Sequence, residues 1–226
     1  PLQFERKDII ECFIDVPAKL DKGSIEVRDI YGRKIEVEII SSEKKEPVLE
    51  QMIDRPMYFA MIRYHCYLFI KNIPPFGYKS LKVKPVKNKA VSKSESIVKL
   101  QKGLPVLENK FLKVSVNKNG TVNLLDKRNK QSFENILYFY DEGEEGGAWT
   151  HKAVKPFITS LSSNPEINII REGNLHSSVE IKHTLNVPAD LDERKKKNGK
   201  KVKLPISLKL KLGKDSTRLD IEVKVN

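Results

Sequence analysis

Hydrophobic and polar residues alternate along several long segments in the second half of the chain, where Val, Ile or Leu takes nearly every second position. The clearest examples are Ser177 to Val187, Pro205 to Leu212 and Arg218 to Val225. A period of two is typical of a β-strand, whose successive side chains point to opposite faces of a sheet. Since Lys and Glu occupy many of the positions between, we expect each strand to bury one face and expose the other.

Four segments of the first half also have the composition of β-strands. Lys7 to Val16 is largely apolar, Tyr58 to Ile73 is rich in aromatic and β-branched residues, and each is followed by a proline. Ile35 to Ile39 and Leu81 to Lys84 alternate with a period of two. These segments predict a small antiparallel β-sandwich over residues 1–95.

A hairpin signal opens a second series of strands. Phe111 to Val116 and Thr121 to Leu125 are β-like, and Asn119 and Gly120 stand between them. Asn-Gly between two such runs is among the strongest short-range signals for a hairpin. Strand-like segments then continue to the last residue with no element to close the sheet. We therefore expect residues 104–226 to form part of a larger sandwich domain that is incomplete.

Residues 86–104 are rich in Lys and Ser, and their first half is almost free of large side chains. This composition is typical of a connection between domains. We therefore expect a linker at residues 96–103, between the small sandwich at residues 1–95 and the larger domain at residues 104–226.

The formal net charge of +12 raises the question of nucleic-acid binding. Much of the excess lies in two lysine-rich segments, residues 86–104 and 190–203. Neither segment interleaves aromatic residues that could stack on bases, as proteins that bind single strands usually do. We interpret both segments as solvated connections and expect no nucleic-acid partner.

Signals for membrane insertion or export are weak. The longest apolar candidate, Tyr58 to Ile73, is shorter than the roughly 20 residues that span a bilayer, and Arg63 and Lys71 interrupt it. No signal peptide opens the sequence. Cys12 and Cys66 could form a disulfide, but two buried thiols in a reducing compartment are the simpler interpretation. We therefore expect a cytoplasmic protein with no membrane partner.

The stretch from Asp141 to Trp149 reverses the basic character of the chain, because four acids and three glycines precede the only tryptophan. Glycines allow positive φ and a close approach of the backbone to another surface. A catalytic pair of carboxylates is normally held on rigid elements, not on a glycine-broken loop. The spacing also lacks the alternation of an EF-hand calcium loop. We interpret the stretch as a solvated or partner-facing loop.

Trp149 and His151 are the candidate binding residues near this loop. An indole can stack on the apolar face of a sugar ring, or it can close the end of a sandwich, and the sequence leaves both possibilities open. His151 could donate a hydrogen bond to a hydroxyl group, or it could be a surface histidine without a role. The four histidines lack the Cys or His neighbours of a zinc site, so we expect no metal ligand within the chain.

Five segments follow one another with the order and spacing of motifs from one protein family. They are Pro1 to Arg6, Ile73 to Tyr78, Leu107 to Phe111 with the hairpin that ends at Lys127, Asp141 to Trp149, and Ser216 to Asn226. Together they resemble the carboxy-terminal β region of glycoside hydrolase family 38, the α-mannosidases. The resemblance covers nearly the whole chain.

The resemblance implies an all-β fold, with a small immunoglobulin-like β-sandwich followed by part of a large supersandwich of the galactose-mutarotase-like type. It also implies a glycosidase that hydrolyses α-mannosidic bonds and acts on mannose-containing oligosaccharides. In this family a zinc ion and an aspartate nucleophile lie in an amino-terminal catalytic domain, which would precede Pro1. The present chain would then be non-catalytic, inactive in isolation, and packed against that domain. The assembly of identical chains into a homo-oligomer also stays an open possibility.

The resemblance further implies that the aromatic residue at the position of Trp149 reaches toward the bound sugar. The substrate-binding candidates are therefore Trp149, Gly147 and His151. Two positions depart from the usual pattern, because Trp149 replaces a Tyr and Gly147 stands where an acid is common. The first change removes a phenolic hydrogen bond and leaves stacking. A carbohydrate-binding module and a purely structural interaction domain are the competing interpretations.

Overall fold

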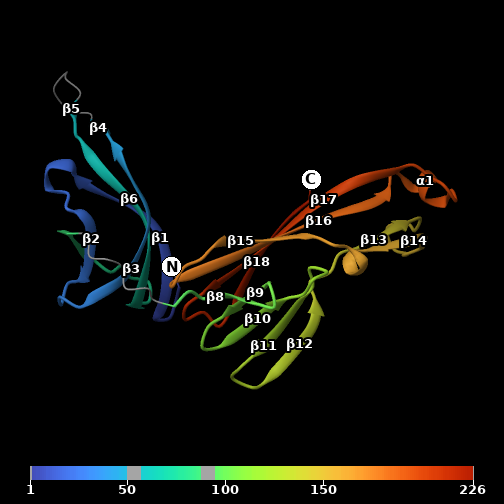
Figure 1. The fold of residues 1–226 in the computed structure, drawn as a ribbon, viewed down its shortest axis with the longest axis horizontal. Coiled ribbons are helices and arrows are strands. Elements are labelled where there is room, and N and C mark those ends of the chain that lie inside the picture. Colours follow the sequence, from blue (N-terminus) through green and yellow to red (C-terminus); the bar gives the residue numbers. More distant parts are fainter. Residues whose placement is uncertain (1, 50–56, 88–94, 226) are drawn as a thin grey trace. The chain divides into compact units, whose positions relative to one another are not determined.

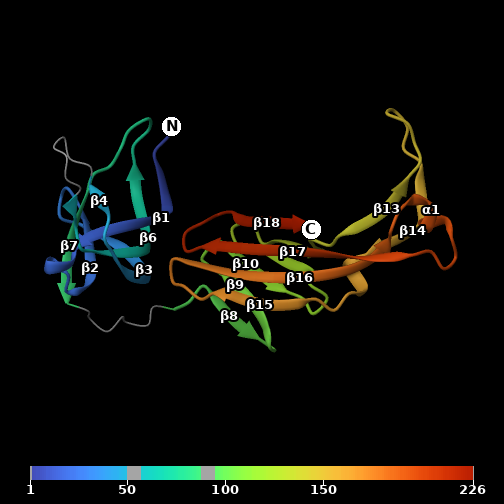
Figure 2. The ribbon, with the colours of Figure 1, turned by 90° about the horizontal axis from the view of Figure 1, so that it is seen from above.

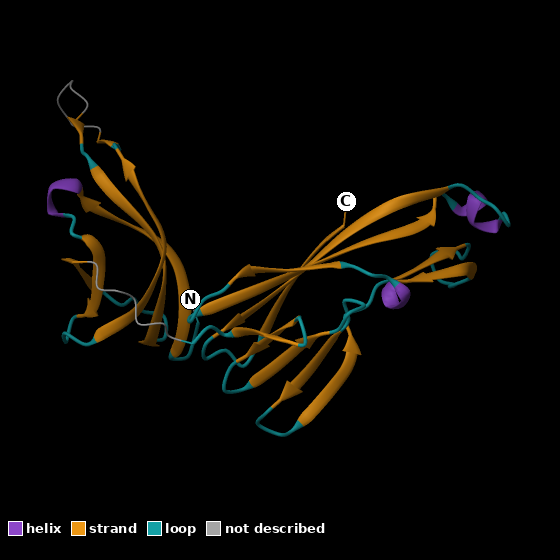
Figure 3. Ribbon diagram, in the orientation of Figure 1, coloured by secondary structure: helices purple, strands orange, loops and turns teal. Residues whose placement is uncertain are grey.

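The computed structural model describes residues 2–49, 57–87 and 95–225. Strands dominate these residues, and the helical segments are short (Figures 1 and 3). The chain divides into two compact units, Pro1–Glu95 and Ser96–Asn226. The all-β sandwich class expected from the alternating pattern is confirmed.

The first unit consists of antiparallel strands arranged around a long central strand. In chain order they are β1 (Arg6–Pro17), β2 (Gly23–Asp29), β3 (Lys34–Lys45), β4 (Val48–Leu49), β5 (Met57–Tyr58), β6 (Met61–Ile73) and β7 (Leu81–Lys87), with a 3-10 turn η1 (Ala18–Leu20) after β1. Strands β1, β6, β3, β2 and β7 form a sheet in that order, and β4 pairs with β5. The predicted strands are confirmed, with the segment Tyr58 to Ile73 divided between β5 and β6.

Strand β3 connects the two layers of this first unit. Its start pairs with β2, where Ile35 lies opposite Val27, and from Glu36 onward it pairs with β6. Val27 packs in one apolar cluster with Val16 of β1 and with Leu68 of β6. Burial of these alternating side chains removes apolar surface from water and holds the layers together.

The second unit contains two larger sheets and a separate hairpin. Its elements are β8 (Val98–Gln101), β9 (Leu104–Glu108), β10 (Leu112–Val116), β11 (Val122–Asp126), β12 (Gln131–Ile136), β13 (Tyr140–Glu144), β14 (Ala153–Thr159), η2 (Ser160–Ser162), β15 (Glu166–Arg171), β16 (His176–Pro188), α1 (Leu191–Lys195), β17 (Lys201–Gly213) and β18 (Leu219–Val225). One sheet has the order β12-β11-β10-β9-β8, the other has the order β15-β16-β17-β18, and β13 pairs with β14. The predicted strands of this half and the hairpin at Asn119 and Gly120 are confirmed.

The two larger sheets pack face to face around the main core. Val114 and Val122 of the first sheet and Ile181 and Leu208 of the second are among its fully buried members. Strands β16 and β17 are long and pair over their whole length, so they continue beyond this core toward α1 and the hairpin (Figure 2). A smaller cluster, which includes Leu185 of β16, forms there.

The expected linker at residues 96–103 is wrong. Residues 98–101 form β8, and Ile97 and Val98 are buried in the core of the second unit. The Ile97 N–H also donates to the carbonyl of Gly173 at 3.0 Å. Two apolar residues in a lysine-rich stretch thus place it inside the second unit, because their burial outweighs its polar composition. Residues 88–94 of the basic segment 86–104 lie outside the described residues.

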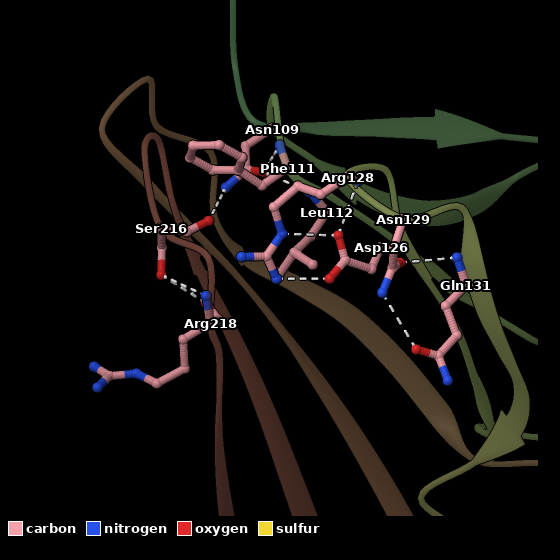
Figure 4. A network of polar contacts seen from close by, with 9 residues as sticks. All are labelled: Asn109, Phe111, Leu112, Asp126, Arg128, Asn129, Gln131, Ser216 and Arg218. Atoms are coloured by element: carbon pink, nitrogen blue, oxygen red, sulfur yellow. Dashed lines mark hydrogen bonds and ion pairs between the residues drawn. The ribbon is translucent and has the colours of Figure 1, made fainter.

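Asn109 joins the turns of the two sheets in the second unit (Figure 4). Its Nδ2 donates to the carbonyls of Gly213 and Ser216 at 2.7 and 2.8 Å. Its Oδ1 accepts from the N–H groups of Phe111 and Leu112, both at 2.8 Å. The amide therefore uses both its donors and its acceptor to fix the turn before β10 against the turn between β17 and β18.

Candidate functional site

The acidic stretch is the first strand and tip of a hairpin, not a loop throughout. Asp141 to Glu144 belong to β13, which pairs with β14 in antiparallel register. At the tip, the Glu145 N–H donates to the carbonyl of Lys152 at 3.0 Å. The expectation of a loop over the whole stretch is therefore wrong, because Asp141, Gly143 and Glu144 pair with residues of β14.

Backbone contacts close the tip of this hairpin. The carboxylate of Glu144 accepts from the N–H groups of Lys152 and Gly146, and these bonds lower the pKa of Glu144. The Gly147 N–H donates to Thr150 Oγ1 at 3.1 Å. A Cβ on Gly146 would overlap the Thr150 carbonyl oxygen. Only glycine fits at that position, so the tip has a defined shape.

Trp149 stands on this closed tip and is 96% exposed. The interpretation that it closes the end of the sandwich is therefore wrong. Gly147, the second candidate residue, lies two positions before it in the same turn, where its carbonyl accepts from the Thr150 N–H at 3.3 Å. Contact of either residue with a sugar stays a prediction.

His151 lies between two carboxylates at the base of the tip. Its Nε2 is 3.0 Å from Glu142 Oε1, and its Nδ1 contacts Glu144 Oε2. A protonated ring can donate at both nitrogens, whereas a neutral ring donates at only one. The structure thus places His151 beside Trp149 and holds its ring in one orientation. Its hydrogen bond to a substrate hydroxyl stays a prediction.

The acids of this hairpin make internal contacts. Glu142 accepts a hydrogen bond from the Tyr140 hydroxyl at 2.8 Å. Glu145 contacts Lys195 of α1 and lies 3.2 Å from Lys152, and both lysines lower the pKa of Glu145. Glu145 is therefore paired with lysines of the same unit, and the contacts of these carboxylates help to orient the hairpin.

Arg194 of α1 contacts both strands of the hairpin, and we call these contacts the Arg194 clamp. The side chain is buried, with Nη2 donating to the carboxylate of Asp141 and Nη1 donating to the carbonyl of Pro156. A Cβ on Gly143 would lie 2.6 Å from Arg194 Cδ, so this glycine permits the close approach. Helix α1 lies beside β14 in both ribbon views (Figures 1 and 2). The interpretation of residues 190–203 as a solvated connection is wrong at Arg194, which is buried.

Sequence reasoning missed Arg194, although two signals were present. It is the only arginine among the lysines of residues 190–203, and guanidinium groups suit buried bidentate contacts better than ammonium groups. Asp190 also precedes it as a helix N-cap, and its side chain accepts from the Glu193 N–H at 2.7 Å. Together they could have indicated a short ordered helix.

The residues that the structure describes provide no set of ligands for the zinc ion that the resemblance implies. Across residues 2–49, 57–87 and 95–225, no group of three or more His, Cys, Asp or Glu side chains could hold a metal ion. The ring nitrogens of His151 contact the carboxylates of Glu142 and Glu144. In the same described ranges, every helix is too short or too polar to cross a bilayer.

The fold defines an all-β protein region of two units, and the second unit carries an exposed tryptophan at a hairpin tip. Residues 107–226 match the family model described as Glycosyl hydrolases family 38 C-terminal domain. The match covers more than half of the chain, so the chain belongs to glycoside hydrolase family 38. The family expected from the sequence motifs is confirmed.

Individual relatives agree with this assignment. The chain is 29% identical over 150 residues to a protein named putative mannosylglycerate hydrolase, from Halalkalibacterium halodurans; the alignment covers 66% of this chain and 16% of the relative. Two solved structures from Enterococcus faecalis have the same fold over 100% of this chain with a TM-score of 0.76. One is an alpha-mannosidase (18% identical), and the other is a protein in the Glycosyl Hydrolase Family 38 (19% identical). The chain spans 29% and 30% of their lengths.

Proposed function

We propose that this chain is the non-catalytic β-sandwich portion of a glycosidase that hydrolyses α-mannosidic bonds. We further propose that the hairpin β13–β14 forms part of the rim of its active site. Family membership supports the first statement. The observation that carries the second is the position of Trp149, which is fully exposed on a tip whose shape is fixed.

The physical argument for the rim rests on the indole. The free energy falls when the faces of a large aromatic side chain leave water. Stacking on the C–H face of a sugar removes one such face from water. Because the Gly147–Thr150 turn and the Arg194 clamp fix the tip, less conformational freedom is lost on binding. His151 lies two residues away, and it would donate to a sugar hydroxyl only after one of its ring nitrogens leaves Glu142 or Glu144.

The catalytic chemistry belongs to another part of the enzyme in this proposal. As the resemblance implies, an amino-terminal catalytic domain would hold the zinc ion and the nucleophile, and this chain would pack against it. The hairpin residues would then bind and orient the sugar, and the rim would help to hold the bond that is cleaved in position.

A mannoside with a small acidic aglycone is a second candidate substrate. The relative from Halalkalibacterium halodurans is named as a putative mannosylglycerate hydrolase, and its alignment covers 66% of this chain. A mannosyl group is common to both candidates, so the same stacking argument applies to each. Comparing the whole enzyme on an oligomannoside and on mannosylglycerate separates them.

A substitution at Trp149 in the whole enzyme tests the rim. We expect Trp149→Ala to lower kcat/KM on an α-mannoside about 5- to 10-fold, because aromatic contacts contribute on the order of 1 kcal/mol. Trp149→Tyr should retain most of the activity. Tyr78→Ala is the matched control, because Tyr78 is also highly exposed but lies in the first unit. Equal values of kcat/KM for Trp149→Ala and the parent enzyme would show that the hairpin is not part of the active site.

An activity assay of the isolated chain tests whether it is non-catalytic. It should show no turnover of an aryl α-mannoside, and turnover at enzyme-like rates would refute the non-catalytic assignment. Calorimetric titration with oligomannose distinguishes a carbohydrate-binding module from a purely structural domain. Binding to the isolated chain that Trp149→Ala abolishes would favour the binding module. No binding, together with an unaffected Trp149→Ala enzyme, would favour the structural domain.

A further inference from the structure

The two cysteines of the chain face each other inside the first unit. Cys12 on β1 lies directly opposite Cys66 on β6 in the antiparallel register. Both side chains belong to the apolar cluster between the layers, with Cys66 fully buried and Cys12 partly buried. Residues 54 positions apart in the sequence are thus brought into contact by the pairing of these two strands.

The geometry of the pair is close to that of a disulfide. The two Sγ atoms are 3.7 Å apart as free thiols. A disulfide requires an S–S distance of about 2.05 Å and Cβ atoms about 3.5–4.5 Å apart. Directly opposite residues in an antiparallel pair have Cβ atoms about 4.5–5.5 Å apart. A side-chain rotation and a strand movement of about 1 Å therefore suffice to form the bond.

The position of β1 makes this movement feasible. Strand β1 is at the edge of the five-stranded sheet, where β6 is its neighbour within the sheet. A strand bonded on one side can shift locally without disturbing a second ladder. The central strand β6, which carries Cys66, is held between β1 and β3 and provides the fixed partner.

The two thiols are unequal in reactivity. Burial, together with the neighbouring Cys12, raises the pKa of Cys66 to about 12, so this thiol is protonated at neutral pH. Cys12 is partly exposed, and it is therefore the sulfur that an oxidant in solution reaches first. This difference fixes an order of events in which Cys12 reacts first and Cys66 completes the bond.

We propose that Cys12 and Cys66 form a reversible disulfide that ties the edge strand β1 to β6 when the protein meets a low-molecular-weight disulfide oxidant. The Cys12 thiolate attacks the oxidant, its S–S bond breaks, and one thiolate leaves. The released thiolate takes the proton of the Cys66 thiol, and the Cys66 thiolate that forms attacks the Cys12 sulfur. The second thiolate of the oxidant then leaves and takes up the proton that Cys12 lost. The cysteine pair loses two electrons, and the oxidant gains them. This site is independent of the hairpin and of the proposed function.

The disulfide would close a loop that contains β2 and β3 and the start of β6. Closure of a long loop restricts the unfolded chain, which stabilises the folded unit. We therefore expect the oxidised form to unfold at a temperature at least about 5 °C higher than the reduced form. Reduction with dithiothreitol should reverse the shift.

Mass spectrometry of the 226-residue chain tests the proposal. The chain is incubated with oxidised glutathione, unfolded in denaturant at neutral pH in the presence of an excess of alkylating reagent, and its intact mass is then measured. We expect a product that lacks two hydrogens, takes up no alkyl group, and regains two alkylation sites after treatment with dithiothreitol. Two alkylated cysteines, or glutathione retained on Cys12, would overturn the proposal.

Two variants control the experiment. Cys12→Ser removes the accessible thiol, so Cys66 should stay reduced and the unfolding temperature should not respond to the oxidant. Cys66→Ala keeps the accessible thiol, so Cys12 should retain one glutathione that no second cysteine displaces. Because Cys66→Ala opens space in the core, Cys12→Ser alone decides the outcome if Cys66→Ala does not fold. An oxidant-dependent rise in the unfolding temperature of Cys12→Ser would contradict the disulfide as its cause.

Discussion

The guanidinium of Arg194 on α1 donates to the carboxylate of Asp141 on β13, and this contact joins two segments that are 53 positions apart in the sequence. The arginine is buried, whereas Asp141 retains partial contact with solvent. Arg194 also donates to the carbonyl of Pro156 on β14, so a single side chain holds both strands of the hairpin. Together with Lys195, which contacts Glu145, Arg194 of this five-residue helix therefore fixes the orientation of the hairpin that carries Trp149.

Replacing Arg194 should loosen the hairpin. We expect Arg194→Met to lower the free energy of unfolding by about 2 kcal/mol, because it leaves Asp141 and the Pro156 carbonyl without their partner. Trp149 is the only tryptophan, so its fluorescence anisotropy reports directly on the tip and should fall. Lysine keeps the charge but offers fewer donors in a fixed geometry. The stability and the anisotropy of Arg194→Lys should therefore lie between those of the parent and those of Arg194→Met. Unchanged anisotropy in Arg194→Met would contradict the role of the clamp.

Periodicity along the sequence predicts the strands correctly because a strand with one buried face requires apolar residues at alternate positions. Val179, Ile181 and Leu185 of β16 show this pattern, and all three are buried. Asn119 and Gly120 likewise predict their hairpin, because the turn itself requires a residue with positive φ, and Gly120 has φ of +81°. Local chemistry is sufficient in both cases.

The features that sequence reasoning missed depend on contacts between distant segments. The partner of Arg194 is on another strand, so composition alone indicates a solvated basic segment. Lysines and serines surround Ile97 and Val98, so composition favours a linker there, whereas the burial of both residues depends on the opposite sheet. The exposure of Trp149 depends on the backbone bonds that close the tip, which the residue types do not reveal.

A pair of glycine substitutions separates backbone strain from crowding in the second unit. Gly120 and Gly103 both have positive φ, +81° and +80°. A Cβ on Gly120 would lie 2.6 Å from His183 Cε1 and 2.8 Å from Pro165 Cγ, whereas Gly103 has open space around it. We expect Gly103→Ala to cost about 1 kcal/mol and Gly120→Ala about 3 kcal/mol, measured by denaturant unfolding. Equal losses would show that His183 and Pro165 yield without cost.

The amide of Asn109 should be more important for stability than that of Asn129, although both appear in the same network (Figure 4). Asn109→Asp replaces two hydrogen bonds to the carbonyls of Gly213 and Ser216 with repulsion between oxygens, which should lower the free energy of unfolding by about 3 kcal/mol. Asn129 is exposed, and its side chain contacts its near neighbour Gln131 (Figure 4). Asn129→Asp should therefore change the stability by less than about 0.5 kcal/mol. Similar losses for the two variants would refute the role of Asn109 in joining the sheets.

The stability of the second unit should fall as the pH is lowered below about 6.5. His183 is buried, and burial lowers its pKa. Its Nδ1 contacts Ser163 Oγ at 2.9 Å, whereas its Nε2 is buried with no hydrogen-bond partner among the described residues. Gly120, Pro165 and Phe139 surround the ring, and none of them carries a charge that could stabilise an imidazolium.

The sign of this pH effect follows from proton linkage. Below about pH 6.5 the unfolded chain takes up a proton at His183 that the folded unit does not, so unfolding becomes more favourable as the pH falls toward the lowered pKa of the folded state. The slope attributable to one such group is at most about 1.4 kcal/mol per pH unit. Chemical denaturation followed by far-ultraviolet circular dichroism at about pH 7.5, 6.5 and 5.5 measures it. In His183→Asn, whose side chain can keep the contact with Ser163 but does not titrate, the slope over this range should become shallower. An unchanged slope in that variant would assign the pH dependence to other groups.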